Sequence, residues 1–534
     1  MDLNSFSADV VIVGLGPTGM VLANFLGKMG WSVVGLERDE DIYYAPRAVH
    51  FDDEIMRIFQ AIGLSEDIAR TSEPFTDMEL LGKPGGKPLM RAKIGHQDQR
   101  YGHHGAWWFH QPTLERHLWE GIARFPDVTT IRGAEVISIE QDDLGVKAKA
   151  KRIDGTTITV RGRYLVGCDG GRSFVRKAAD LCLASANFDE AWVVVDTKAR
   201  CAGKDSILPV NHQQICDPKQ PVTYVPMAGP YYEWQFMVTG GKSEREATNP
   251  ALVRSQLKRF VDLNRVEINR IAYYKFHALW ATEWRNGRIL LAGDSAHQMP
   301  PFLGQGMCSG LRDAHALAWR LDLILASRAD ETLLDDYQIE RLDHVSHIIK
   351  GAMFLGRVIQ TRHRWLAALR NTLLFWPANK SARINQLVYR TANRKQPLKR
   401  GFFGKIRPRI AGHLSIQPMV TFNGTDMLLD EAMGNGFAIV ARKDTLAASR
   451  STINRLAIER NFAFLEIGLP RSGATVVDKD GTLLTWMETF DADFVLIRPD
   501  RYVFDAGRTP DFLKAVTPLV TAITPFPAIE RIPA

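Results

Sequence analysis

Residues 8–19 read ADVVIVGLGPTG, an apolar run that ends in three spaced glycines. The run is rich in β-branched residues, which is typical of a buried parallel strand. A helix-like stretch, Met20–Met29, follows the glycines, and a second apolar run, Ser32–Leu36, ends at Glu37. This order of strand, glycine turn, helix and strand predicts a Rossmann-type α/β fold for the N-terminal part of the chain.

The glycine turn has the composition of a dinucleotide site. Gly14, Gly16 and Gly19 would let the backbone approach a pyrophosphate at the start of the helix, where free N–H groups and the helix dipole favour an anion. Glu37 follows the third glycine by 18 residues, a position from which a carboxylate accepts hydrogen bonds from an adenosine ribose. The alternative is a turn that only packs a helix on a sheet. By itself this turn does not distinguish NAD from FAD.

Two later stretches repeat the pattern of a strand followed by a turn. Residues 164–176 read YLVGCDGGRSFVR, and residues 293–307 read GDSAHQMPPFLGQGM after an apolar run at 288–292. Asp294 at the end of that strand is expected to be a buried carboxylate, which is costly unless hydroxyl groups of a sugar or polyol hydrogen-bond to it. The glycines at 304–306 lead into an expected helix over about 307–325, whose N-terminus would stabilise negative charge on a ring.

Together, GLGPTG, CDGGRSFVR and GDSAHQMPPFLGQGM resemble the three fingerprints of the class A (single-component) FAD-dependent aromatic monooxygenases, which have the p-hydroxybenzoate hydroxylase fold. The most similar subgroup is the 3-(3-hydroxyphenyl)propionate hydroxylase-like enzymes. The resemblance covers about residues 8–400 and includes PRAV at 46–49, FDDE at 51–54 and HQP at 110–112. The chain has one G-x-G-x-x-G and no C-x-x-x-x-C, which argues against Baeyer–Villiger enzymes and disulfide reductases.

The resemblance implies an α/β protein in four parts. Residues 1–185 would be the first part of a Rossmann-type, glutathione reductase-like FAD-binding domain, with residues of about 75–110 contributing to the substrate side. Residues 186–285 would be an inserted mixed β-sheet that binds the substrate, and residues 286–400 the second part of the FAD-binding domain. Residues 412–534 would be a thioredoxin-like C-terminal domain, without C-x-x-C and therefore without redox work.

The implied reaction is hydroxylation of a phenolic or related aromatic or heteroaromatic ring by NAD(P)H and O2, through a C4a-hydroperoxide of FAD. The alternatives are a tailoring or antibiotic-inactivating oxygenase of the same fold, acting by epoxidation or decarboxylating hydroxylation, and a non-catalytic flavoprotein docked on a membrane. The implied partners are a small aromatic substrate, O2 and, in a homodimer, a second copy of the chain. No nucleic-acid or metal motif accompanies them.

The resemblance also implies which residues hold the cofactor. The expected FAD-binding positions are Gly14, Gly16, Pro17, Thr18 and Gly19 at the pyrophosphate, Glu37 and Arg38 at the adenosine ribose, Arg47 and Gln111 on the flavin side, Asp169 at FAD and the passing nicotinamide, Asp294 at the ribityl chain, and Pro301, Gly304, Gln305, Gly306 and Met307 at the pyrimidine edge of the flavin.

The substrate side is less well defined by the sequence. The reaction needs a partly deprotonated phenol, so a histidine or tyrosine near the ring hydroxyl would help. His50, three residues after Arg47, and Tyr224, in a strand-like region, are the candidate catalytic residues, although either could simply pack in a core. The phenylpropionate subgroup tends to carry basic residues just before W-E-F, whereas this chain has Glu233, which argues against a carboxylate substrate at that position.

The charge of the chain is uneven. The 534 residues carry a formal net charge of +7, and His344–Thr425 contains fifteen Lys/Arg and no Asp or Glu. Within it, Phe354–Trp376 spaces apolar residues at helical intervals among arginines. A solvated helix face is the simpler interpretation, and contact with an anionic membrane surface the alternative. Five scattered cysteines and the lack of a signal peptide favour the cytoplasm.

Overall fold

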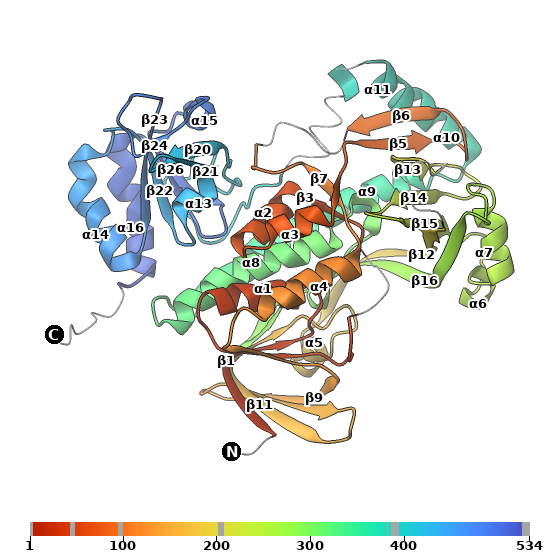
Figure 1. Cartoon of the computed structure of the whole chain (residues 1–534), viewed down its shortest axis with the longest axis horizontal. Coiled ribbons are helices and arrows are strands. Elements are labelled where there is room, and N and C mark those ends of the chain that lie inside the picture. The colour runs from red at the N-terminus through yellow and green to blue at the C-terminus, as the bar shows by residue number, and fades with distance from the viewer. Residues whose placement is uncertain are drawn as a thin grey trace. The chain divides into compact units, whose positions relative to one another are not determined.

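The computed structural model describes residues 4–42, 48–93, 100–200, 208–381, 383–385 and 395–525. The chain forms two compact units, which are described separately. Unit 1 comprises Met1–Asp98, His104–Ala314 and Val345–Arg394, and unit 2 comprises Gln99–His103, His315–His344 and Lys395–Ala534. Figure 1 labels their helices and strands along the chain.

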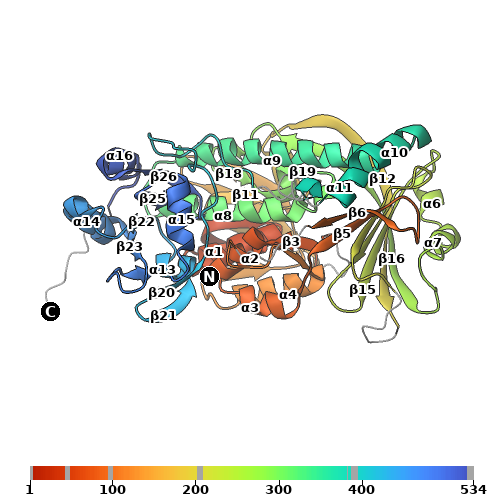
Figure 2. The same cartoon turned by 90° about the horizontal axis from the view of Figure 1, so that it is seen from above.

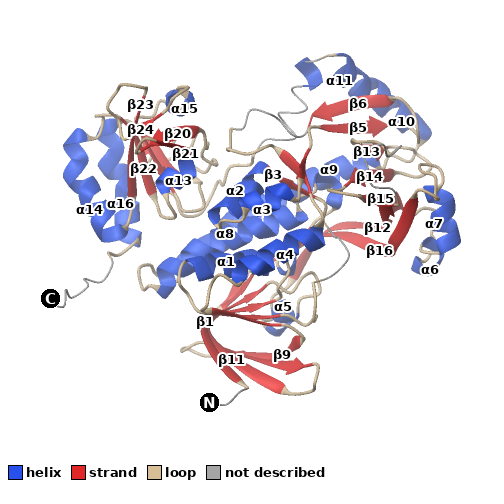
Figure 3. Cartoon of the chain, in the orientation of Figure 1, coloured by secondary structure: helices blue, strands red, loops and turns tan. Residues whose placement is uncertain are grey.

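The first sheet of unit 1 is the predicted Rossmann-type sheet. Its parallel strands have the order β18-β11-β1-β2-β8, with β17 at one edge and the antiparallel β9 and β10 extending β11. Val10–Ile12 are fully buried, as expected for a strand covered on both faces. Helix α1 packs on β1 and β2 and beside α4 (Figure 3). The strands are β1 (Ser5–Val13), β2 (Val33–Leu36), β8 (Val128–Ile131), β9 (Ala134–Gln141), β10 (Val146–Arg152), β11 (Thr157–Gly167), β17 (Arg285–Asn286) and β18 (Ile289–Leu291).

The second sheet of unit 1 is the expected mixed sheet, with the order β19-β16-β12-β15-β14-β13-β5-β6. Residues 77–93 supply its last two strands, so part of the segment of about 75–110 belongs to this sheet; its role on the substrate side stays a prediction. Apolar residues on one face pack with α7, and Figure 2 shows α6 and α7 beside the sheet. The strands are β5 (Asp77–Leu81), β6 (Pro88–Lys93), β12 (Leu183–Ala199), β13 (His212–Ile215), β14 (Val222–Pro226), β15 (Tyr231–Met237), β16 (Val266–Ala281) and β19 (His297–Gln298).

A small sheet, β3-β7-β4, and several helices complete unit 1. Its short strands are β3 (His50–Asp52), β4 (Glu73–Pro74) and β7 (Ala106–Trp108). The helices are α1 (Pro17–Lys28), α2 (Asp53–Ala61), α3 (Ser65–Arg70), α4 (Gln111–Ile122), α5 (Phe174–Ala178), α6 (Glu244–Ala247), α7 (Pro250–Leu257), α10 (Arg364–Arg370) and α11 (Trp376–Lys380), with a π-helical turn at Asn371–Phe375.

Helices α8 (Gly306–Leu325) and α9 (Leu333–Ile359) contribute residues to both units. Residues 315–344, which lie in the expected second part of the FAD-binding domain, group with unit 2 by their contacts. These residues form a set of buried ion pairs within unit 2. Glu340 lies 2.7 Å from a guanidinium nitrogen of Arg320 and 2.7 Å from one of Arg498, and all three side chains are fully buried.

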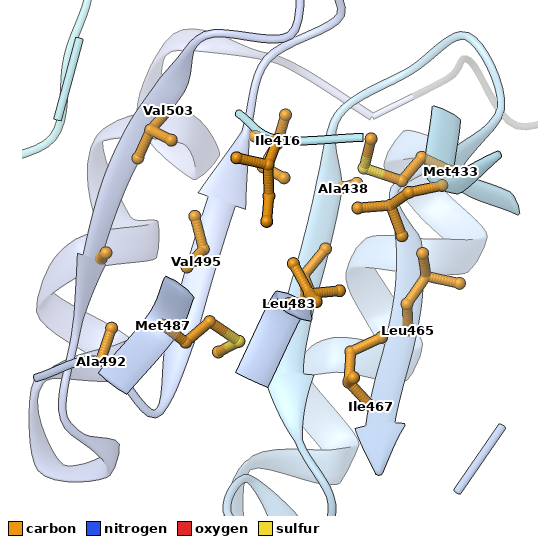
Figure 4. Packing of buried hydrophobic residues seen from close by; sticks show 14 of the residues in the cluster. Ile416, Met433, Ala438, Leu465, Ile467, Leu483, Met487, Ala492, Val495 and Val503 are labelled. Atoms are coloured by element: carbon orange, nitrogen blue, oxygen red, sulfur yellow. The ribbon is translucent and has the colours of Figure 1, made fainter. Parts of the chain in front are cut away.

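The sheet of unit 2 contains a thioredoxin-like core. Strands β22 and β23 are parallel, β25 is antiparallel to β22, and β26 is antiparallel to β25; the order is β21-β20-β24-β23-β22-β25-β26. Aliphatic side chains of these strands pack against α13 and α15, as Figure 4 shows. The elements are β20 (Met419–Phe422), β21 (Thr425–Leu428), α13 (Leu429–Met433), β22 (Ala438–Arg442), α14 (Arg450–Arg460), β23 (Ala463–Gly468), β24 (Val476–Val477), α15 (Thr482–Thr489), β25 (Phe494–Ile497), β26 (Val503–Gly507) and α16 (Phe512–Ala522).

Helices α8 and α9 have 20 and 27 residues, which is the length of a membrane span. Within the described ranges, however, no helix is both long and apolar enough to cross a bilayer. The four cysteines in these ranges, Cys168, Cys182, Cys216 and Cys308, are free thiols.

Candidate functional site

The glycine turn between β1 and α1 has the geometry that the sequence predicted. Gly14 has φ +96°, and a Cβ there would lie 2.5 Å from the carbonyl oxygen of Cys168. A Cβ on Gly19 would lie 2.0 Å from the Gly14 carbonyl oxygen, so this glycine lets the helix approach the turn. A Cβ on Gly16 would meet nothing within 4 Å. Gly16 also provides no side-chain cap for α1, whose first residue is Pro17. Open space at an uncapped helix N-terminus fits a pyrophosphate.

Glu37 holds the backbone of this turn. Its carboxylate accepts hydrogen bonds from the N–H groups of Leu15 (2.8 Å) and Asp39 (3.1 Å). A carboxylate has further acceptor sites, so a ribose contact is compatible with this arrangement and stays a prediction. Arg38 has a largely exposed side chain that lies 3.6 Å from the carboxylate of Asp39.

Asp169 caps its own turn. Its carboxylate accepts hydrogen bonds from the Ser173 hydroxyl (2.5 Å) and from the N–H groups of Phe174 (2.7 Å) and Val175 (3.0 Å). Nearby, the buried Arg176 donates to the carbonyl oxygens of Ser295 (2.8 Å) and Gly171 (3.0 Å), and thereby joins the second motif to the third. The structure therefore shows a local role for Asp169, and its contact with FAD or the nicotinamide stays a prediction.

The expectation that Asp294 is buried was wrong. A 3-10 turn, Gly293–Ser295, follows β18, and within it Asp294 is exposed while Gly293 and Ser295 are buried. The Ser295 hydroxyl donates to the Gly167 carbonyl oxygen (2.6 Å), which anchors the turn. Close packing shapes it further, since a Cβ on Gly293 would lie 2.7 Å from the Thr18 hydroxyl oxygen. The protein itself does not desolvate the Asp294 carboxylate, and only a ligand such as a ribityl chain would cover it.

This exposure leads to a prediction for Asp294→Ala. Substitution of an exposed residue changes the free energy of unfolding by only about 0.5 kcal/mol. Loss of charge-assisted hydrogen bonds to ribityl hydroxyls weakens FAD binding by about 1.5–3 kcal/mol, roughly 10- to 100-fold. Flavin content after gel filtration and the melting temperature of the apoprotein measure the two effects. A variant with wild-type flavin content would contradict the assignment of Asp294.

An ion network that the sequence did not predict supports the loop before α8. Arg312 contacts the carboxylates of Asp52 (2.6 Å) and Glu54 (2.7 Å), and all three residues are buried. Arg312 also donates to the Gln305 side-chain oxygen (2.8 Å), which fixes an expected FAD residue. The available signal was the pair of charged motifs FDDE and LRDA, because buried charges are normally paired.

Pro301, Gly304, Gly306 and Met307, which are further expected FAD residues, belong to the same loop and the start of α8. Pro301 begins a 3-10 turn, Pro301–Leu303, that ends at Gly304 in the left-handed region (φ +61°). Gly306 and Met307 open α8. Gln111 is buried, and its side chain accepts from the Ala48 N–H (2.8 Å) and donates to Glu115 (2.7 Å), so it supports the neighbouring segment. Arg47 lies outside the described residues.

His297 and Asp313 fasten the third motif to helix α8. Asp313 accepts from the Gly293 N–H (3.0 Å) and lies 2.7 Å from Nε2 of His297, and both side chains are fully buried. Through Asp313, helix α8 is therefore hydrogen-bonded to the loop of the third motif.

One face of the mixed sheet is turned toward the loop before α8. The Trp192 ring lies 6.0 Å from that of Phe302 in an edge-to-face contact. Side chains alternate along strands, so Asp196 shares the face of Trp192, and the strand pairing places Glu233 beside Asp196. We call this face of β12–β15, which bears Trp192, Asp196 and Glu233, the substrate face.

Tyr224 lies on the opposite face, so the structure does not support its predicted catalytic role. It is fully buried among Trp234, Val195 and Leu257, and its hydroxyl donates to the Pro209 carbonyl oxygen (2.8 Å). Burial raises the pKa of Tyr224 far above the ordinary value for tyrosine. These contacts give Tyr224 a packing role, the alternative that the sequence had left open.

The substrate face carries a buried pair of carboxyl groups. Asp196 lies 2.5 Å from Nε of Arg270, and Glu233 accepts from the Gln235 side-chain amide (2.5 Å). Burial, together with the adjacent Asp196 carboxylate, raises the pKa of Glu233 to about 8. Burial also raises the pKa of Asp196, against the opposing effect of Arg270. At neutral pH one proton is therefore held between these two acids.

This pair predicts how stability depends on pH. The ordinary glutamate pKa is 4.5, and the folded value for Glu233 is about 8. The stabilising effect of the neutral acid is complete below pH 4.5 and is lost as the pH rises through 8. Glu233→Gln keeps a neutral side chain, so this loss, on the order of 5 kcal/mol, is expected only in the wild type. Urea unfolding at several pH values measures it, and parallel curves for the two proteins would contradict the prediction.

His50, the other candidate catalytic residue, lies between the loop and the sheet. A Cβ on Gly304 would be 2.8 Å from its Nδ1, and its ring lies 5.6 Å from Phe75 and 5.9 Å from Trp108. Trp108 in turn contacts His212, a residue that no sequence motif had singled out. The expected position of His50 beside the flavin loop agrees with this geometry, and its part in the reaction stays a prediction.

Comparison with known proteins gives matches along nearly the whole chain. Residues 7–352 match the family described as FAD binding domain, and residues 412–522 match the HcaD C-terminal domain. A probable NADH-specific resorcinol 4-hydroxylase of Rhodococcus jostii (strain RHA1) is 36% identical, over 98% of this chain and 96% of that protein. A 3-(3-hydroxy-phenyl)propionate/3-hydroxycinnamic acid hydroxylase of Klebsiella pneumoniae (strain 342) is 33% identical, over 93% and 91%.

A solved structure shows the same fold. The flavin-dependent monooxygenase PieE, in complex with FAD and substrate, superimposes with a TM-score of 0.80 at 21% identity, over 97% of this chain and 99% of that one.

Proposed function

The chain belongs to the FAD-dependent aromatic monooxygenases, and we propose that it hydroxylates an uncharged phenol, of the resorcinol type, at the expense of NADH. When bound, FAD supplies the transfer of electrons to O2 and of one oxygen atom to the ring. The turn at Gly14–Gly19 and the Asp294 turn would hold this cofactor, and the substrate face of the mixed sheet would hold the ring. The protein's own contribution is to bind, orient and shield the ring from water.

The observation that carries the proposal is the charge of the substrate face. Arg270 is already paired with Asp196, and Glu233 adds a second acid beside them. A substrate carboxylate placed there would find no free cation, because Asp196 already neutralises Arg270 and the neighbouring Glu233 is a neutral acid, so burial of its charge would be uncompensated. An uncharged phenol meets no such penalty. This distinction favours the substrate named for the Rhodococcus protein over the phenylpropionate named for the Klebsiella protein.

The electron donor and the cellular compartment of the reaction are proposed on separate grounds. The name of the Rhodococcus protein specifies NADH, and we extend that preference to this chain. We place the reaction in the cytoplasm, since the four described cysteines are free thiols, as is usual in a reducing compartment. The homodimer expected from the sequence stays a prediction.

A substrate panel tests the proposal directly. Purified protein is expected to be yellow, to oxidise NADH faster than NADPH, and to oxidise it faster still with resorcinol or phenol. Mass spectrometry should show one added oxygen atom in the product. 3-(3-Hydroxyphenyl)propionate is the matched carboxylated substrate and should stimulate turnover much less. Colourless protein that takes up no FAD, or a preference for the carboxylated phenol, would contradict the proposal.

A further inference from the structure

Among the buried ring nitrogens without a hydrogen-bond partner in the described part of the chain are Nε1 of Trp108 and Nε2 of His212, whose rings are neighbours. Each of these two atoms is screened from solvent. Buried polar atoms in folded proteins are almost always paired with protein, water or ligand. Two such atoms in adjacent side chains therefore indicate a place where a polar ligand group binds.

The position of the two side chains identifies that place. Their rings are 5.6 Å apart and nearly perpendicular, and Trp108 stacks on Phe75 with a centroid separation of 3.6 Å. His50 links this group to the flavin loop through its contacts with Trp108 and Gly304. The Trp108 ring and the two unpartnered nitrogens of Trp108 and His212 thus lie between the flavin loop and the mixed sheet.

The strand register places His212 on the substrate face. Gln213 pairs with Tyr224, and Tyr224 pairs with Trp234, so these three residues share the face covered by α7. His212, one residue before Gln213, therefore lies on the other face, with Asp196 and Glu233. The two unpartnered nitrogens and the acid pair belong to the same side of the sheet.

We propose that Trp108 and His212 bind a hydroxyl group of the aromatic substrate. The indole N–H donates to the hydroxyl oxygen, and the neutral imidazole, with its proton on Nδ1, accepts the hydroxyl proton at Nε2. A phenolic hydroxyl satisfies both nitrogens at once because it is both donor and acceptor. A methyl ether or a bare C–H cannot donate to Nε2, so the subsite selects phenols. This assignment rests on the proposed function and adds the residues that read the hydroxyl.

The electrostatics of His212 agree with an accepting role. Burial, and secondarily the charge of His50, lowers the pKa of His212 to about 3. The imidazole is then neutral throughout the pH range in which enzymes of this kind work. So weak a base polarises the hydroxyl by a hydrogen bond but does not keep its proton, and His212 is therefore a positioning and specificity residue.

The test compares phenol with anisole in the holoenzyme. Dissociation constants are measured from the change that ligand binding causes in the flavin absorbance. The wild type is expected to prefer phenol by at least 10-fold, and His212→Phe and Trp108→Phe should reduce this ratio toward one with unchanged FAD content. His212→Gln, which keeps an acceptor, should recover part of the ratio. His117→Phe, a histidine on α4 that contacts Thr71, is the control and should leave the ratio unchanged.

The outcomes separate this inference from the proposed function. If the wild type takes up FAD and hydroxylates phenols, but His212→Phe keeps the full preference for phenol over anisole, the subsite is wrong and the function stands. If the wild type neither takes up FAD nor responds to phenols, the proposed function fails. A loss of kcat without any change in the phenol-to-anisole ratio would also overturn the assignment.

An independent observation concerns the surface of α10, the π-helical turn and α11. Trp365, Leu369, Leu373 and Trp376 are exposed by 68%, 49%, 62% and 59%. Their spacing of four, four and three residues places them on one side of a helical stretch. Adjacent large apolar side chains at this exposure usually mark an interaction site. We call these four residues the tryptophan stripe.

Cationic side chains flank the tryptophan stripe along the chain. The exposed cations are Arg357, Arg362, Arg364, Lys380 and Arg383. The segment from residue 344 to residue 425 contains no acid, although Arg362 interacts electrostatically with Glu190 of β12. A two-fold contact between copies would set these cations against each other, whereas anionic lipid headgroups would neutralise them. Tryptophan is also the side chain most enriched at membrane interfaces. We infer that the tryptophan stripe docks on an anionic membrane surface.

Vesicle co-sedimentation of the full chain tests this inference. Binding is expected to phosphatidylglycerol vesicles at low salt, and to be at least 10-fold weaker at high salt or with phosphatidylcholine. Trp365→Ser combined with Trp376→Ser should abolish it, whereas Leu144→Ser, at a side chain that is 90% exposed elsewhere, should not. No binding to phosphatidylglycerol at low salt, equal binding by the double variant, or a dimer that the double variant loses would each overturn the inference.

Discussion

Gly19→Ala should cause an almost complete loss of FAD from the purified protein. The new Cβ would lie 2.0 Å from the Gly14 carbonyl oxygen, far inside contact distance, and the obstacle is backbone rather than a movable side chain. Helix α1 would have to move away from β1, and with it the N–H groups expected to face the pyrophosphate. Overpacking of this kind costs about 3 kcal/mol, which corresponds to a roughly 100-fold loss of affinity if it falls on the bound state.

Gly16→Ala is the matched control within the same turn. Its Cβ would meet nothing within 4 Å, and the residue has an ordinary φ of −74°. The apoprotein should therefore melt at the wild-type temperature, while FAD affinity falls only through contact with the cofactor itself. Isothermal titration with FAD and thermal unfolding of both apoproteins check this pair. Wild-type FAD affinity in Gly19→Ala would refute the close packing of α1 on the glycine turn.

Glu340→Ala should strongly destabilise unit 2. Its carboxylate contacts Arg320 at 2.7 Å and Arg498 at 2.7 and 2.8 Å, and it also accepts from the Phe402 N–H at 2.9 Å. Without it, two fully buried guanidinium groups lose their shared partner, although Asp500 and the Phe402 carbonyl oxygen still contact Arg498. Breaking a buried pair in this way costs about 3–5 kcal/mol.

Chemical denaturation measures this loss of stability, and two further variants serve as comparisons for its size. Glu340→Gln keeps an acceptor but not the charge, so an intermediate loss is expected. Glu459→Ala removes an exposed partner of Arg460 (3.0 Å) and should cost no more than about 1 kcal/mol. If Glu340→Ala unfolds within about 1 kcal/mol of the wild type, the buried pairs are not what holds residues 315–344 in unit 2.

The elements that could be predicted are those whose signal is local. The strand Val10–Val13, the glycine turn and helix α1 follow one another within a short stretch of the chain. Each has a signal that depends only on neighbouring residues: β-branched side chains for the strand, glycine for the left-handed backbone of the turn, and helical periodicity for α1. The region of the mixed sheet was also predictable, since strands β12 to β16 occupy almost the same stretch as the expected range 186–285. The strand β16, Val266–Ala281, was not, because its half-buried residues show little hydrophobic contrast along the chain.

In the candidate site, several contacts could not be predicted from the sequence. Asp294 was expected to be buried because its strand is buried, but a 3-10 turn of three residues directs it to solvent. Arg312 and Asp52 are 260 residues apart in the sequence, and neither motif contains a signal that identifies the other as its ion-pair partner. The side of the sheet on which Tyr224 and His212 lie depends on strand register, and a shift of one residue would exchange them.

The sequence by itself determined the class of the protein, because its three motifs of spaced glycines and acids together resemble those of the FAD-dependent aromatic monooxygenases. It also determined that unit 2 has no C-x-x-C chemistry. Only the tertiary structure decided which polar groups meet around the ring, because these contacts form between strands and loops far apart in the chain. The acid pair Asp196–Glu233 and the unpartnered nitrogens of Trp108 and His212 exist as a site only once the mixed sheet has set its register.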